Sequence, residues 1–260
     1  MVKNYLVIGN PIEHSLSPKL HNFWFKENNI NAIYDKKLIV ENELESFFSF
    51  MKKNNITGVN VTVPFKQKVI PFLDKISDLS IKVKSVNTIT LDNGQLIGDN
   101  TDIIGFQNSL NKFNLKGKKA LIFGAGGVVS SVVLALNNLG LENITITNRT
   151  KNKAEILSEK YNLEVCEWGK ILDADIYINC TSIGLNKNDI MDIDFSKING
   201  KIFYDIIYKP KTNFLINAEK YGNQFIDGKM MFLYQAQKSF EIWHGIKPKI
   251  CEQTQALLND

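Results

Sequence analysis

Residues 119–150 decide the fold and read KALIFGAGGVVSSVVLALNNLGLENITITNRT. The apolar run 120–123 leads directly into the glycine-rich turn Gly124-Ala125-Gly126-Gly127. Residues 128–139 have the pattern of a helix, and residues 143–147 that of a second strand. A strand, a glycine turn and a helix in this order are the context in which a dinucleotide-binding fingerprint works.

The glycine turn itself fits the fingerprint incompletely. Glycines let the backbone approach a pyrophosphate, whose charge the helix N-terminus then stabilises. The sixth position of the fingerprint should be Gly or Ala, but here it is Val129. The turn alone therefore leaves two interpretations open, a cofactor site and a purely structural connection.

The end of the next strand favours a particular cofactor. Asn148-Arg149-Thr150 lies about 25 residues after the first glycine, where an NAD site would carry an acidic residue and an NADP site an arginine. Arg149 is the only arginine among 31 basic residues. This favours a position where the planar guanidinium is needed to bind a phosphate through several donors. Lys153, one helical turn later, can add a second charge. The alternative interpretation is that Arg149 is simply a solvated residue at the start of a helix.

The rest of the chain alternates short apolar runs with helical patterns, which predicts an α/β protein with largely parallel sheets. Asn93-Gly94 marks a hairpin turn between two short strands. We expect the last strong helix to cross back onto the first domain. The expected strands are 5–8, 32–39, 58–63, 87–91, 95–98, 174–179, 201–206 and 224–226, and the expected helices include 19–28, 43–54 and 230–243.

A length of 260 residues suits two compact domains. We expect an N-terminal open α/β domain over residues 1–102, completed by the C-terminal helices 229–260. Residues 103–228 are expected to form a Rossmann-type dinucleotide-binding domain.

Composition argues against several other classes of protein. The net charge of +4 is spread over lysines without long runs, so we expect no nucleic-acid partner. The N-terminal apolar run is too short for a signal peptide or membrane span, which predicts a soluble, cytoplasmic protein whose mature chain begins here. The three cysteines are expected to be buried thiols, the histidines show no metal-binding pattern, and His244 is expected at the surface or as a helix cap.

Three polar motifs follow strands of the first domain, where open α/β sheets place their sites. They are Ser15-Leu16-Ser17-Pro18, the stretch from Asn60 to Lys66, and Asn100-Thr101-Asp102. Ser17 also fits a helix N-cap with Pro18 at the first helical position.

Taken in order, these and other motifs closely resemble the shikimate dehydrogenase family over essentially the whole chain. The resemblance implies two α/β domains and NADP-linked, reversible reduction of 3-dehydroshikimate to shikimate, a step of the shikimate pathway to chorismate and aromatic amino acids. The matching stretches are GNPIEHSLSPKLHN, GVNVTVPFK, SVNT, GDNTD, GAGG, NRT, NCTSIG, YDIIYKPKT and GKMMFLYQA.

The resemblance also implies roles for individual residues. Lys66 and Asp102 match the catalytic pair, and Met231 matches a residue near the nicotinamide. The implied substrate ligands are Ser15, Ser17 and Tyr208 for the carboxylate, and Thr62, Asn87 and Gln235 for the ring oxygens. The implied cofactor residues are Gly124, Ala125, Gly126, Gly127, Asn148, Arg149 and Thr150.

The sequence departs from the family pattern at Ile103, Val128, Val129 and Ser130, which affects helix packing and cofactor affinity rather than the implied substrate ligands. Three rival interpretations remain: a quinate/shikimate dehydrogenase that also accepts NAD, a glutamyl-tRNA reductase type of oxidoreductase, and a non-catalytic sensor of a shikimate-like ligand. The intact Lys66 and Asp102 argue against the sensor. A monomer and a homodimer are equally compatible with the sequence.

Overall fold

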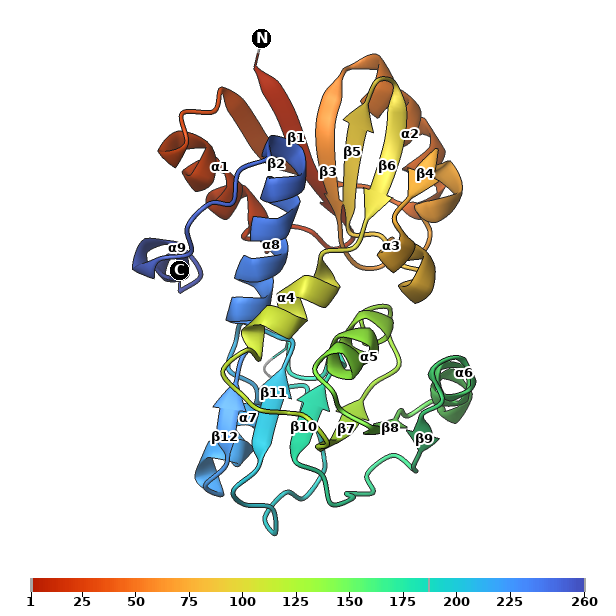
Figure 1. Ribbon diagram of the computed structural model, residues 1–260, viewed down its shortest axis with the longest axis vertical. Helices are drawn as coiled ribbons and strands as arrows, with labels where there is room; N and C mark the ends of the chain where they lie inside the picture. The colour runs from red at the N-terminus through yellow and green to blue at the C-terminus, as the bar shows by residue number, and fades with distance from the viewer. Residues whose placement is uncertain (1, 187, 260) are drawn as a thin grey trace. The chain divides into compact units, whose positions relative to one another are not determined.

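The computed structural model describes residues 2–186 and 188–259, which divide into two compact units. The first unit runs to Gly105 and resumes at Leu233, and the second extends from Phe106 to Phe232. The boundaries fall inside helices α4 (Asp102–Ser109) and α8 (Lys229–His244), which Figure 1 labels. Among the described residues, no helix combines the length and apolarity that crossing a membrane requires.

The first unit is built on a mixed sheet with strand order β2-β1-β3-β5-β6-β4. Strand β1 pairs in parallel with β2 and β3, whereas β5 is antiparallel to β3 and β6. The strands are β1 (Lys3–Gly9), β2 (Ala32–Leu38), β3 (Ile56–Val61), β4 (Lys75–Ile76), β5 (Thr88–Asp92) and β6 (Gln95–Asp99). The helices are α1 (Ser17–Glu27), η1 (Glu41–Glu43), α2 (Leu44–Lys53), η2 (Ile70–Phe72), α3 (Asp78–Val83) and, near the C-terminus, α9 (Glu252–Ala256).

The expected hairpin is confirmed, because β5 and β6 pair around a turn in which Asn93 and Gly94 have φ angles of 47° and 78°. The expected strand over 58–63 is displaced: β3 ends at Val61, so Thr62 and Val63 lie outside it. Pro64 explains the early end, since proline has no N–H for the ladder and restricts the residue before it.

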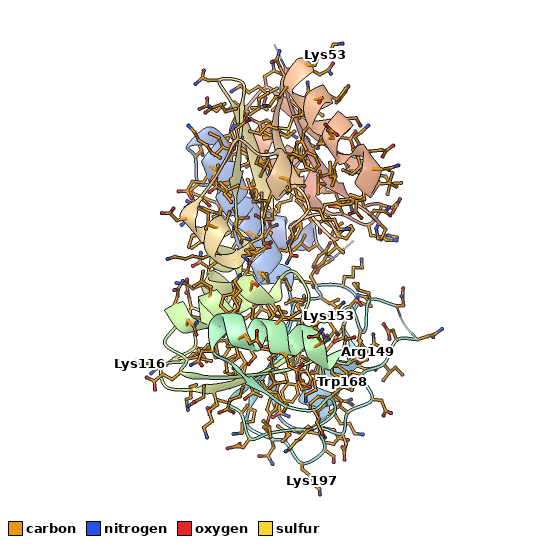
Figure 2. The ribbon with its side chains drawn as sticks, turned by 90° about the vertical axis from the view of Figure 1, so that its right-hand side faces the viewer. Lys53, Lys116, Arg149, Lys153, Trp168 and Lys197 are labelled. Carbon is orange, nitrogen blue, oxygen red and sulfur yellow. The ribbon has the colours of Figure 1, made fainter. Side chains whose placement is uncertain are left out.

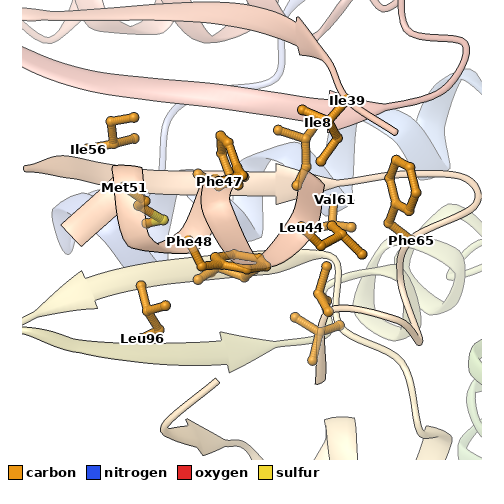
Figure 3. Close-up of a cluster of buried hydrophobic side chains, with 14 residues drawn as sticks. Ile8, Ile39, Leu44, Phe47, Phe48, Met51, Ile56, Val61, Phe65 and Leu96 are labelled. Carbon is orange, nitrogen blue, oxygen red and sulfur yellow. The ribbon is translucent and has the colours of Figure 1, made fainter. Parts of the chain in front are cut away.

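One face of this sheet packs on helix α2. Its residues Leu44, Phe47, Phe48 and Met51 are buried, and Figure 3 shows them among side chains of the neighbouring strands. They recur at the three- and four-residue spacing of one helical face.

The opposite face of the sheet carries an aromatic layer shared by β1, α1 and α8. Tyr5 lies 4.9 Å from the Trp243 ring, and the Trp243 indole donates to the carbonyl of Ile89. A Cβ atom on Gly58 would come within 2.6 Å of the Trp243 ring, so only glycine lets α8 approach the strand this closely. From Leu233 onward, α8 belongs to the first unit.

The second unit is a parallel sheet of six strands with helices α5 (Val129–Asn138), α6 (Lys151–Tyr161) and α7 (Asn213–Lys220). Its strand order, β12-β11-β10-β7-β8-β9, is that of the doubly wound dinucleotide-binding fold, with the order reversing between β7 and β10. The strands are β7 (Lys119–Phe123), β8 (Asn143–Thr147), β9 (Glu164–Val165), β10 (Ile176–Asn179), β11 (Ile202–Asp205) and β12 (Gln224–Ile226).

Two histidines lie inside the aromatic layer of the first unit. His21 is fully buried and stacks on Tyr34 with ring centroids 4.4 Å apart. His244, the last residue of α8, is half-buried: its ring lies 5.2 Å from that of Tyr5 and its Nε2 is buried, so the expectation of a surface or capping residue was only partly right. Burial lowers the pKa of His21 to about 3, helped by His244, and lowers that of His244 to about 4.

The buried His21 should make the folded protein sensitive to acid. Its pKa lies below the usual 6.5, so the unfolded state takes up the proton first and stability falls as the pH drops from about 6.5 toward 3. We expect His21→Phe to reduce the slope of unfolding free energy against pH in this window by about 1.4 kcal/mol per pH unit, measured by urea denaturation. The control His14→Gln, at an exposed position, should keep the wild-type slope. An unchanged slope in His21→Phe would contradict this account.

Candidate functional site

The first unit brings the predicted catalytic pair into direct contact. Lys66 lies in the loop after β3, where its carbonyl accepts a hydrogen bond from the Val86 N–H. Its ammonium Nζ is 2.6 Å from Oδ2 of Asp102, the first residue of α4. The Lys66 side chain is 18% exposed and that of Asp102 5%, so the cation can be reached while its partner is buried.

Asn87 joins this pair from the other side of the carboxylate. Its Nδ2 lies 2.9 Å from Oδ1 of Asp102 and 3.5 Å from Oε1 of Gln235 on α8. Two oxygens of one carboxylate therefore receive donors from two different elements. Three residues that the sequence placed far apart, Lys66, Asn87 and Asp102, form one hydrogen-bonded group with Gln235 at its edge.

Below this group lies a network of buried hydroxyl and amide groups that the sequence analysis missed. Asn60 accepts a hydrogen bond from the Tyr34 hydroxyl at 2.7 Å and donates to the carbonyl of Asn87. Thr88 and Ser239 lie 2.7 Å apart within it. Burial raises the pKa of Tyr34 well above 10, so its phenol stays a neutral donor. The motifs NVTVPFK, SVNT and GDNTD contained several of these residues, but the sequence does not show which of them meet.

Ser15, Ser17 and Thr62 lie in or beside the loops that follow β1 and β3. Ser17 is the first residue of α1 and buried, whereas Ser15 and Thr62 are partly exposed. The N-cap residue of α1 is Leu16, and its side chain makes no capping bond to the described residues, so the N-cap expectation for Ser17 was wrong by one position. The hydroxyl of Ser17 is instead directed toward Tyr34.

In the second unit, the glycine turn connects β7 to α5 at the point where the strand order reverses. Gly124 has a φ of 107°, and a Cβ atom there would be 3.0 Å from the backbone of Cys180. Cβ atoms on Gly126 and Gly127 would meet no described atom within 4 Å. The first glycine therefore satisfies a packing constraint, and the next two leave open space beside the start of a helix.

Arg149 and Lys153 lie at the start of α6, as Figure 2 shows. Both side chains are exposed, and Asn148 just before them donates from Nδ2 to the carbonyl of Thr150 at 2.8 Å. This bond fixes the turn from which Arg149 extends. The two cations are thus accessible to an anionic group from solution.

A buried carboxylate organises the loops after β10 and β11. Asp205 accepts hydrogen bonds from Asn179 at 3.0 Å and from the Thr212 hydroxyl at 2.6 Å, and burial raises its pKa to about 6. Tyr208 follows on the same loop, with its ring 5.1 Å from that of Phe232. Asn179 and Asp205 belong to the motifs NCTSIG and YDIIYKPKT, but the sequence does not show that the two motifs meet.

The four departures from the family pattern are accommodated by packing. Ile103, Val129 and Ser130 are buried, and Val128 is partly buried as the N-cap residue of α5. Of the cysteines expected to be buried, Cys180 is, whereas Cys166 and Cys251 are partly exposed. Among the described residues, His, Cys, Asp and Glu side chains form no cluster able to hold a metal ion.

These features define a class of protein. A parallel sheet in this order, with its first turn made of glycines, belongs to the dinucleotide-binding α/β proteins, and the Lys66–Asp102 group in the other unit can move a proton.

Comparisons with known proteins identify the family. Residues 7–89 match the model of the shikimate dehydrogenase substrate-binding domain, and residues 107–207 match that of shikimate/quinate 5-dehydrogenase. A shikimate dehydrogenase (NADP(+)) of Pelagibacter ubique is 52% identical, with all of both chains covered.

Solved structures agree. Shikimate dehydrogenase from Aquifex aeolicus has a TM-score of 0.94 at 36% identity, covering 99% of this chain and 97% of that one. Shikimate 5-dehydrogenase from Thermus thermophilus, in complex with NADP(H) and shikimate, has a TM-score of 0.92 at 29% identity, covering 100% and 99%. The chain belongs to the shikimate dehydrogenase family.

The glycine turn yields a stability prediction with an internal control. Gly124→Ala should destabilise the protein by about 1–3 kcal/mol, because alanine strains the positive φ and its Cβ meets the Cys180 backbone. Gly126→Ala should change stability by less than about 0.5 kcal/mol, since its Cβ enters open space. Denaturant unfolding of both variants checks this, and equal losses would contradict it.

Proposed function

We propose that this chain catalyses the reversible, NADPH-dependent reduction of 3-dehydroshikimate to shikimate in the shikimate pathway. The observation that carries the proposal is the Lys66 ammonium, held 2.6 Å from Asp102 and still partly exposed, in a chain of this family. The Pelagibacter ubique relative is a shikimate dehydrogenase (NADP(+)), and the Thermus thermophilus structure contains both NADP(H) and shikimate.

The second unit fits NADP on its own features. The pyrophosphate would lie on the turn of Gly124, Ala125, Gly126 and Gly127, where the two later glycines leave open space and the start of α5 supplies backbone N–H groups. Asn148, Arg149, Thr150 and Lys153 would surround the 2′-phosphate, and Met231 would lie near the nicotinamide. Arg149 suits this role because a guanidinium binds phosphate oxygens through several donors at once.

The first unit would bind the substrate. In this proposal its residues Ser15 and Ser17 bind the carboxylate, and Thr62, Asn87 and Gln235 bind the ring oxygens. Tyr208, which belongs to the second unit, is a carboxylate ligand only by the family resemblance. Because Asn87 also donates to Asp102, a ring hydroxyl placed there would be held by both residues. Neutral ligands suit a polyhydroxylated ring, since a site built to pair hydroxyls rejects analogues that lack them.

Bound NADPH supplies the hydride for the reduction. As the ketone is reduced, negative charge develops on its oxygen, and the Lys66 ammonium both stabilises that charge and donates the proton. Asp102 holds the ammonium in place through its 2.6 Å contact, and Asn87 fixes the other oxygen of the carboxylate. In the reverse direction Lys66 takes the proton back, in its neutral form.

The catalytic role of Lys66 is tested by kinetics. We expect Lys66→Ala to lower kcat by roughly 10²- to 10⁴-fold, the usual range for acid–base catalysis, with a much smaller change in KM for shikimate. Initial rates of NADPH oxidation with 3-dehydroshikimate, and of NADP reduction with shikimate, measure this in both directions. The control Lys68→Ala removes a nearby lysine that pairs with Glu41 at the surface, and it should behave as wild type. A raised KM at wild-type kcat would reassign Lys66 to binding.

The choice of cofactor depends on Arg149. Wild type should prefer NADP to NAD strongly, and Arg149→Ala should raise KM for NADP while leaving the weak NAD reaction nearly unchanged, because only NADP carries the phosphate. Arg149→Lys should recover part of the loss, since it restores the charge without the planar fork. The measurement is kcat/KM for both cofactors in each variant. A wild-type ratio near one would favour the dual-specificity quinate/shikimate interpretation instead.

A further inference from the structure

Three hydroxyl groups from separate parts of the first unit meet behind the Lys66–Asp102 pair. Thr88 lies on β5, Thr101 just before α4, and Ser239 on α8, and each is at most 1% exposed. The Ser239 oxygen is 2.7 Å from that of Thr88 and 3.2 Å from that of Thr101. We call these three residues the hydroxyl cluster.

Thr101 determines which way the Asn87 amide faces. The backbone N–H of Thr101 donates to Oδ1 of Asn87 at 2.8 Å, so the Asn87 oxygen must lie on that side. Its Nδ2 then faces the Thr101 hydroxyl and Oδ1 of Asp102, both at 2.9 Å. With the amide reversed, its oxygen would face the carboxylate of Asp102, and two acceptors would repel each other.

The Ser239 hydroxyl has an acceptor outside the cluster. Ser239 donates to the carbonyl of Gln235 at 3.1 Å, one helical turn earlier on α8. Asn60 donates from Nδ2 toward Ser239 and Thr88, at 3.0 and 3.1 Å. Ser239 therefore connects α8, and with it Gln235, to the residues that orient Asn87.

We propose that Thr101 is a positioning residue for the proton-transfer pair, supported by Ser239: its hydroxyl and N–H lock the Asn87 amide so that Asn87 fixes the Asp102 carboxylate toward Lys66. This inference rests on the proposed function of Lys66 and Asp102. Thr101 itself contacts Asn87 in two ways, through side chain and backbone, and removing the hydroxyl takes away one of the acceptors that the Asn87 amide faces.

Two substitutions of Thr101 separate positioning from simple packing. Thr101→Val keeps the side-chain volume and removes the hydroxyl, so kcat should fall about tenfold, the effect of one buried hydrogen bond, while KM for NADPH stays as in wild type. Thr101→Ser keeps the hydroxyl and loses a methyl group, so it should be less stable than wild type and retain most of its kcat. A purely structural role predicts the opposite, a serine variant at least as impaired in kcat as the valine variant.

Thr90→Val is the matched control. Thr90 lies on β5 like Thr88, and its hydroxyl oxygen is buried with no hydrogen-bond partner among the described residues. This variant makes the same chemical change on a neighbouring part of the same sheet, and it should keep wild-type kcat.

A double-mutant cycle of Thr101→Val and Ser239→Ala tests the cluster as a unit. Ser239→Ala alone should lower kcat by a few-fold, and the double variant should lose less than the product of the two single losses, because both act through Asn87. Equal kcat in Thr101→Val and wild type, or a product that is simply multiplicative, would overturn the proposal. The proposed function itself would fail on different results: a wild-type protein that does not reduce 3-dehydroshikimate, or a Lys66→Ala variant with wild-type kcat.

Discussion

The ion pair of Lys66 and Asp102 determines how the buried polar groups of the first unit are arranged. A carboxylate taken out of water is tolerated only if its oxygens are paired, and Asp102 is 5% exposed at the side chain. One oxygen faces the ammonium and the other the Asn87 amide, which in turn has its own partners in Thr101. The buried polar groups behind the pair therefore allow a charge to be kept at this position. A network whose groups are all hydrogen-bonded also keeps a single geometry.

The second unit meets a different constraint, which is to leave room for an anion beside a helix start. A Cβ atom at Gly124 would come within 3.0 Å of the Cys180 backbone, whereas one at Gly126 would face open space. The strand end that approaches Gly124 is itself held by Asn179, which donates to the buried Asp205. Burial makes the charged form of Asp205 costly and raises its pKa to about 6. Three hydrogen-bond donors, from Asn179, the Ile207 N–H and the Thr212 hydroxyl, stabilise that charge.

Much of this could be predicted from the sequence, because short-range patterns determine it. The glycine turn after an apolar strand and the Asn93-Gly94 hairpin are local signals, and both agree with the structure. Contacts between distant segments leave no such signal. Nothing in the order of residues shows that Ser239 meets Thr88, or that His244 lies against Tyr5, since both depend on how α8 is rotated over the sheet.

Because of this rotation, α8 carries both a stabilising aromatic contact and a polar contact near the Lys66–Asp102 pair. On α8, Trp243 packs against Tyr5 at a contact that only glycine at position 58 permits, and its indole bonds the carbonyl of Ile89 on β5. One turn earlier, Ser239 reaches Thr88, the first residue of the same strand. The aromatic contact thus determines how far the polar side of the helix approaches Asn87. A change that shifts the aromatic layer by a fraction of an ångström would also move the hydroxyl cluster, because close-packed interiors transmit such displacements.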